Sequence, residues 1–115
     1  MTEWKISLQA ELDKAEQARA KGNEGQARVC ARRAAGIAAR EYFARQGKTF
    51  RTPSAYDLLN ELAHEAGVSS ELRQSAEYLT LRVNEEFKLP VDVDLIEEAR
   101  KLCEGLLKNI DPEGS

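Results

Sequence analysis

Residues that bind metal ions or form disulfides are scarce in this sequence. Its 115 residues contain one histidine, His64, and two cysteines, Cys30 and Cys103. Structural zinc sites and haem sites need several Cys or His ligands, so we expect no metal ion and no cofactor. Each cysteine lies in an apolar helical pattern, and we expect two small buried thiols rather than a disulfide.

Long apolar runs are absent as well. No stretch approaches the roughly 20 apolar residues that cross a membrane, and the first residues lack the apolar region of a signal peptide. The composition, 42% hydrophobic and 32% charged, is typical of a folded globular protein with a charged exterior. We therefore expect residues 1–115 to form a single cytoplasmic domain without membrane contacts.

Apolar residues at three- and four-residue spacing are abundant, and this pattern predicts helices and no strand. Five pairs of cap and stop signals bound the predicted helices: Thr2 and Gly22, Asn23 and Gly47, Thr52 and Gly67, Ser69 or Ser70 and Pro90, and Asp94 and Ile110. We predict an all-α fold. It is an antiparallel bundle of about five helices, with a four-helix up-and-down core plus an extra helix.

The second predicted helix is rich in alanine and arginine. Its small residues recur on more than one side: Ala27, Ala31, Ala34, Ala35, Ala38 and Ala39. Because alanines fill little volume, neighbouring helices can approach closely, and we expect this helix at the centre of the bundle. The same helix carries five arginines against two acids, Glu24 at its start and Glu41; the arginines are Arg28, Arg32, Arg33, Arg40 and Arg45.

The net charge of −3 conceals an uneven distribution. Residues 1–52 contain eleven Lys/Arg and six Asp/Glu, a net charge of +5, whereas residues 53–115 contain six and fourteen, a net charge of −8. Such asymmetry occurs in proteins that bind nucleic acid or a partner of opposite charge. It also arises when complementary charges meet between helices, or when a homodimer pairs unlike faces. The arginines likewise have two interpretations, phosphate binding or solvated and internally paired side chains.

No side chain stands out as catalytic. His64 is the only imidazole and is expected at the surface or its boundary, and Ser69 and Ser70 are expected as helix caps. The adjacent carboxylates at 85–86 and 97–98 point in different directions on a helix. The turn at 22–25 contains glycines but lacks the Lys-Ser/Thr of a phosphate-binding loop. We therefore predict no catalytic residue.

The order of motifs resembles the HEPN family (higher eukaryote and prokaryote nucleotide-binding domains) over nearly the whole chain. The resemblance covers a small-residue turn, an Ala-rich helix, a segment similar to the family's T-H-D-L-L, a helix ending in a motif similar to R-Y-P, and an Ala/Leu helix. These are residues Ala18–Asn23, Arg32–Phe43, Pro53–Leu59, Lys88–Pro90 and Leu95–Ile110. The sequence departs from the family at Gly36, where members have Glu, and at Tyr56, where they have His.

Ribonuclease members of this family carry an Arg followed four to six residues later by His. No His follows Arg82 in this chain, so the general acid–base group for RNA cleavage is missing. The resemblance therefore implies a non-catalytic binding or assembly module, with nucleotide or RNA as a ligand. The candidate binding residues are Arg32, Arg33, Arg40, Arg82 and Lys88.

The resemblance also implies protein partners. These are a second copy in a homodimer, formed by the second and fourth helices, and a small nucleotidyltransferase-like protein, as in two-component toxin–antitoxin pairs. Two alternatives stay open. One is a peptide-binding adaptor similar to tetratricopeptide proteins, which an apolar groove between helices would favour. The other is a divergent ribonuclease that uses Arg82.

Overall fold

The computed structural model describes residues 2–51, 54–82, 89 and 91–110. Within them the chain forms five helices and no strand, which confirms the predicted all-α fold. The helices are α1 (Glu3–Ala20), α2 (Glu24–Arg45), α3 (Ala55–Ala63), α4 (Ser70–Leu79) and α5 (Leu95–Ile110). None of them is long and apolar enough to span a membrane.

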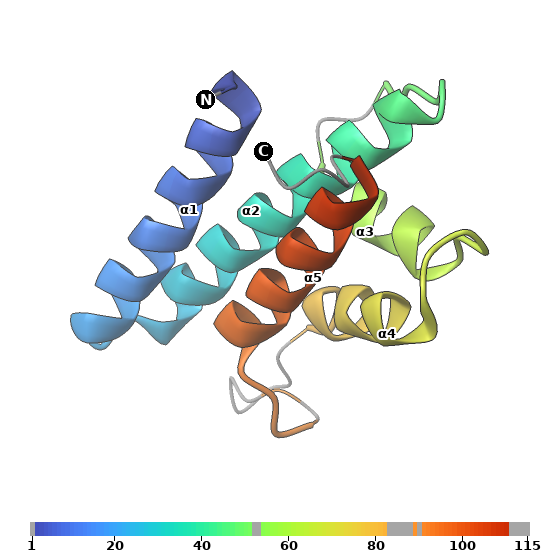
Figure 1. Ribbon diagram of the computed structural model, residues 1–115. Helices are drawn as coiled ribbons and strands as arrows, with labels where there is room; N and C mark the ends of the chain where they lie inside the picture. Colours follow the sequence, from blue (N-terminus) through green and yellow to red (C-terminus); the bar gives the residue numbers. More distant parts are fainter. Residues whose placement is uncertain (1, 52–53, 83–88, 90, 111–115) are drawn as a thin grey trace.

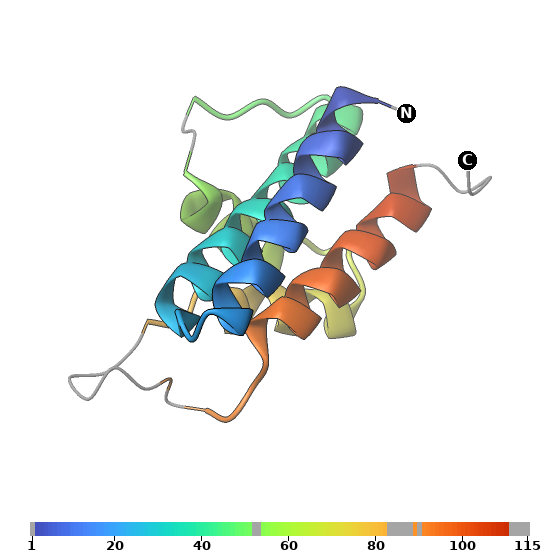
Figure 2. The ribbon, with the colours of Figure 1, turned by 90° about the vertical axis from the view of Figure 1, so that its left-hand side faces the viewer.

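Three long helices lie side by side, and two short ones complete the bundle (Figure 1). A tight turn at Lys21–Asn23 joins α1 and α2 as an antiparallel hairpin, and Gly22 supplies the positive φ of 80° that the turn requires. Helix α5 packs against α2 and runs in the same direction, as Figure 2 also shows, whereas α1 runs opposite to both, so neighbouring helices are not all antiparallel. On the side away from α1, α3 packs against α2 and α4 packs against α5, and α3 and α4 contact each other.

Helix α2 is the centre of the bundle, as predicted. It packs against α1, α3 and α5, and its six predicted alanines have no exposed surface. The buried apolar side chains of all five helices form one core around it. Cys30 and Cys103 belong to this core as free thiols, and the Cys103 Sγ donates to the Ala34 carbonyl at 3.7 Å. Burial raises the pKa of Cys103 to about 12.

Helix α3 begins later and ends earlier than the sequence predicts. Its N-cap is Ser54, whose Oγ accepts a hydrogen bond from the Asp57 backbone at 3.3 Å. The helix ends at Ala63, before the expected stop at Gly67, and His64 is its exposed C-cap. The predicted cap at Thr52 and Pro53 lies outside the described residues. Because the helix ends early, the apolar pattern shifts in the following turn, where Val68 is buried and Ala66 is exposed.

Helix α4 ends at Leu79, although the sequence predicts a helix that continues to Pro90. In a continuing helix the Leu79 carbonyl would accept a hydrogen bond from the residue four positions later. Here Arg32 of α2 donates its Nε hydrogen to that carbonyl at 2.6 Å. The Thr80 hydroxyl also donates a hydrogen bond to the Glu77 carbonyl at 2.8 Å. The remainder of the predicted helix at 83–88, including Lys88, lies outside the described residues.

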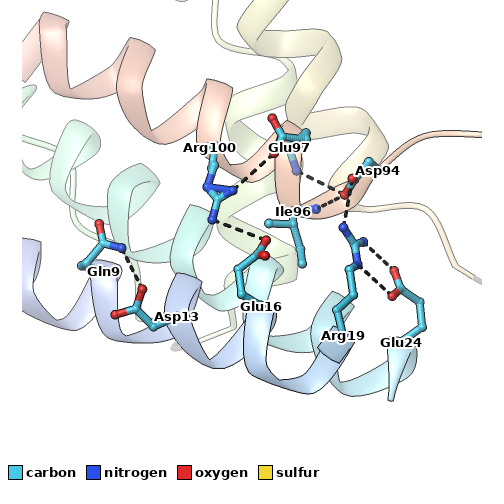
Figure 3. A network of polar contacts seen from close by, with 9 residues as sticks. All are labelled: Gln9, Asp13, Glu16, Arg19, Glu24, Asp94, Ile96, Glu97 and Arg100. Carbon is cyan, nitrogen blue, oxygen red and sulfur yellow. Dashed lines mark hydrogen bonds and ion pairs between the residues drawn. The ribbon is translucent and has the colours of Figure 1, made fainter. Parts of the chain in front are cut away.

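A network of charged side chains joins the start of α5 to the hairpin (Figure 3). Arg19 donates to both carboxylate oxygens of Glu24, at 3.0 and 2.7 Å, and to Asp94 at 2.9 Å. Asp94 in turn caps α5 by accepting from the backbone of Ile96 at 3.0 Å. Opposite charges from the two halves of the chain therefore meet between helices at this end, as one interpretation of the charge asymmetry predicts.

The same contacts alter two pKa values. Hydrogen bonds from Arg19 lower the pKa of Glu24, and burial only partly opposes them. At Asp94 burial opposes ionisation, but hydrogen bonds from Arg19 and from the Glu97 backbone outweigh it, and the pKa is again lowered. The folded chain therefore binds fewer protons than the unfolded chain in mild acid, so these groups contribute stability that is lost as the pH falls through the folded pKa values.

Arg19→Gln should make the stability less sensitive to acid. The wild-type free energy of unfolding should decrease from about pH 5 towards pH 3, and the variant should show a shallower decrease, because its two carboxylates have lost their partner. Urea unfolding at several pH values measures this. Arg45→Gln, which removes an ion pair within α2, is the control and should keep the wild-type slope. A variant slope equal to that of the wild type would contradict the assignment.

Gly36→Ala should destabilise the bundle. A Cβ added at Gly36 would lie 2.5 Å from the Cβ and 2.9 Å from the Cα of Ala55, so α3 must move away. We expect a loss of about 1–3 kcal/mol in thermal or urea unfolding. Gly25→Ala is the matched control, because its Cβ would meet only the Asn23 side chain, at 3.9 Å. That variant should be unchanged or more stable by up to about 1 kcal/mol.

Candidate anion-binding site and adjoining groove

Three arginines surround Tyr56 where α2, the start of α3 and the exit of α4 meet. Arg28, Arg32 and Tyr56 line a hollow of about 260 Å³ together with Arg82, Gly25 and Val29. The Arg82 guanidinium carbon lies 4.5 Å from the centre of the Tyr56 ring, a cation–π distance. We call Arg28, Arg32 and Arg82 the arginine cluster. No carboxylate is among the described residues that line its hollow.

Arg32 is the fixed member of the arginine cluster. Its Nε donates to the Leu79 carbonyl at 2.6 Å and its Nη2 to the Leu81 carbonyl at 3.3 Å. Burial lowers its pKa, and the positive charges of Arg82 and Arg28 lower it further. Arg32 thereby holds the chain that leaves α4 against α2. This attachment brings Arg82 to Tyr56, although the two residues belong to different elements.

Arg28 and Arg82 differ from Arg32 in how they are held. Arg28 is half-buried, and neither it nor the exposed Arg82 forms an ion pair with another described residue. Their guanidinium hydrogens can therefore turn towards a ligand in the hollow. Guanidinium groups bind the oxygens of phosphates and carboxylates through two parallel hydrogen bonds. The chemistry that this arrangement supports is recognition of an anion.

A larger groove of about 740 Å³ adjoins the hollow and shares Val29, Arg32 and Tyr56 with it. Helix α2 forms its floor, and α1 and the start of α3 form its walls. The other lining residues are Ser7, Ala10, Glu11, Lys14, Arg33, Gly36, Ile37, Arg40, Ser54, Ala55 and Leu58. We call this larger cavity the α1–α3 groove and keep the word hollow for the smaller one.

The sequence-predicted candidates divide between these two places. Arg32 and Arg82 belong to the arginine cluster, whereas Arg33 and Arg40 line the α1–α3 groove, which Arg32 also borders. The fifth candidate, Lys88, lies outside the described residues. The five candidates therefore do not form one site within the part of the chain that is described.

Sequence reasoning missed Arg28 and Tyr56 as site residues. Arg28 lies one helical turn before Arg32, so the i, i+4 spacing already placed the two on one face. Tyr56 stands out in the sequence only as the position where the HEPN pattern has His, and in the structure it is half-buried and lines the hollow. No local signal connects either residue to Arg82, because only the chain path around α3 and α4 brings them together.

The remaining polar side chains have structural roles. Ser69 caps α4 by accepting from the Leu72 backbone at 3.3 Å, as one of the two expected caps. The buried Ser75 donates to Glu98 at 2.8 Å and joins α4 to α5. His64 is exposed, and its Nδ1 lies 2.9 Å from the Asn60 carbonyl. No group of metal-ligating side chains occurs within residues 2–51, 54–82, 89 and 91–110.

Comparison of the chain with protein-family models, with curated proteins and with solved structures finds no match. What the chain binds must therefore be inferred from its own residues.

Arg32→Met should destabilise the fold more than the loss of a surface charge does. The variant keeps an apolar stem but leaves the Leu79 and Leu81 carbonyls without their donors. Charged hydrogen bonds contribute about 1.5–3 kcal/mol, and we expect a loss of this size in urea unfolding. Arg33→Met is the control, because Arg33 is exposed on the same turn, and its effect should stay within about 0.5 kcal/mol. Equal effects of the two variants would refute the structural role of Arg32.

Proposed function

We propose that this chain is a non-catalytic, HEPN-like binding module whose arginine cluster binds the phosphate groups of a nucleotide or of RNA. The observation that carries the proposal is the convergence of three guanidinium groups on one hollow that no described carboxylate lines. Like charges brought together in this way repel one another, and a bound phosphate would replace that repulsion with attraction.

The lining residues suit phosphate better than a neutral ligand. Arg28 and Arg82 offer guanidinium forks, and Arg32 adds a positive charge that is already fixed in place. Tyr56 adds a hydroxyl group and an aromatic ring. A nucleotide or an RNA strand carries both the phosphates and the aromatic bases that such a mixture of side chains recognises.

Two observations support a binding role without catalysis. His64 lies beyond the far end of α3 and is not among the residues that line the hollow or the groove. The sequence also has no His after Arg82. General acid–base cleavage of RNA needs a proton donor and acceptor near the phosphate, and arginine does not fill this role at neutral pH. The divergent ribonuclease is therefore the weaker proposal.

The assembly part of the proposal rests on the HEPN resemblance. It includes a homodimer and a small nucleotidyltransferase-like partner of the toxin–antitoxin kind. The tetratricopeptide-like adaptor is a separate candidate, favoured by one specific observation, which is the groove between α1 and α3.

RNA binding to the arginine cluster can be measured by fluorescence anisotropy with a fluorescein-labelled 12-nucleotide RNA, with ATP as competitor. We expect binding that weakens as KCl rises, and a several-fold loss of affinity in Arg28→Gln and in Arg82→Gln. Each variant should also reduce the slope of log affinity against log salt by about one. Electrophoresis of the recovered RNA should show it intact.

The control is Arg45→Gln, because Arg45 is exposed near the C-terminal end of α2 and lines neither the hollow nor the groove. Thermal melts of all variants establish that they are folded. Wild-type affinity in both cluster variants would overturn the proposed site, and cleavage that disappears in Arg82→Gln would favour the ribonuclease.

A further inference from the structure

One face of the central helix is open. Helices α1 and α3 flank α2 but, within the described residues, do not pack against each other. Between them α2 presents a stripe at helical spacing: Val29, Arg33, Ile37 and Arg40. Val29 and Ile37 are half-buried and Arg33 and Arg40 are exposed, whereas the six alanines between Ala27 and Ala39 on the other sides of α2 are fully buried. This stripe is the floor of the α1–α3 groove.

The groove has an apolar interior of helical length. Val29 and Ile37 form the accessible floor and the exposed Ala10 contributes from α1, whereas the lining residues Gly36 and Leu58 are themselves buried. The floor extends from Val29 to Arg40, about 16 Å at 1.5 Å per residue, or three turns of a helix. Open apolar surfaces between helices are the sites into which amphipathic helices insert.

The charges around the groove are mostly positive. Lys14, Arg32, Arg33 and Arg40 line it, and the only carboxylate among the described lining residues is that of Glu11. Glu11 is already paired with Lys14 of its own helix, at 3.4 Å. Arg33 forms no ion pair within the described part of the chain. The groove therefore combines an aliphatic floor with an excess of cationic side chains.

We propose that the α1–α3 groove binds an acidic amphipathic helix of a partner protein, about three turns long. Its apolar side chains, at i, i+4 and i+7, cover Val29, Ile37 and Ala10. Its flanking Asp and Glu side chains lie beside the cationic rim of the groove, where Arg33 can pair with them. An RNA strand fits this groove less well, because aliphatic side chains offer no stacking surface and the one aromatic lining residue, Tyr56, lies towards the arginine cluster.

This proposal does not depend on phosphate binding at the arginine cluster. Arg28 and Arg82 line only the hollow, whereas Ile37 and Arg33 line only the groove. The two proposals can therefore fail separately.

The probe is a fluorescein-labelled, lactam-stapled 14-residue helix with Leu at i, i+4, i+7 and i+11 and Glu at the flanking positions. Two control peptides accompany it. One has the same composition but leucines that share no face, and the other has Lys in place of each Glu. We expect the first peptide to bind the full chain with an affinity that decreases as salt rises, and each control peptide to bind at least tenfold more weakly. Methyl NMR spectra should show shifts at Val29, Ile37 and Ala10 and none at Ile6.

Matched variants test the site. Ile37→Ser and Arg33→Glu should each weaken peptide binding at least tenfold. Ile6→Ser and Lys108→Glu should not change it, because Ile6 and Lys108 are exposed and lie outside the groove. Arg82→Gln should leave peptide binding unchanged even if it abolishes RNA binding. Circular dichroism establishes that every variant is folded.

Five results would overturn the proposal, the first four of which concern the peptide and RNA. These four are failure of the acidic peptide to bind, equal binding of the scrambled peptide, wild-type affinity in Ile37→Ser, and competition by a 12-nucleotide RNA that itself loses affinity in Ile37→Ser. A fifth is a dimer in light scattering that Ile37→Ser dissociates, because a second copy of the chain would then occupy the groove.

Discussion

The close approach of helices to α2 is the constraint on which the rest of the structure depends. Alanines face three neighbouring helices, and at Gly36 the backbone of α3 comes so near that even a methyl group does not fit. Between Ala27 and Ala39 the packed sides of this helix carry only small side chains. Four of its five arginines lie on the remaining side, where the arginine cluster and the α1–α3 groove lie.

Arg32 connects this packing to the candidate site. Its side chain extends from α2 and donates to two carbonyl groups at the exit of α4. The same side chain thereby ends a helix, satisfies carbonyl oxygens that would otherwise lose a partner, and fixes the chain just before Arg82. A residue chosen from the sequence as a ligand-binding arginine is thus first a structural one.

Much of the fold follows from local signals. The periodic stripes and the caps at Asn23 and Asp94 define α1, α2 and α5 closely, because these signals depend only on neighbouring residues. The end of α4 could not be predicted in this way, since it depends on a donor 47 positions away. The site was predicted in part for the same reason. Composition and spacing indicated arginines as ligand-binding residues. Which arginines lie near Tyr56 and which line the groove depends on the position of α3, which local signals do not predict.

The two buried thiols allow opening of the core to be measured without first attaching a probe. Cys30 of α2 and Cys103 of α5 are both buried, and the Cys103 thiol, whose pKa burial raises to about 12, has almost no thiolate at neutral pH. An alkylating reagent can thus reach them only when these helices separate. The rate of labelling then reports how often the closed bundle opens, and it does so in the natural sequence.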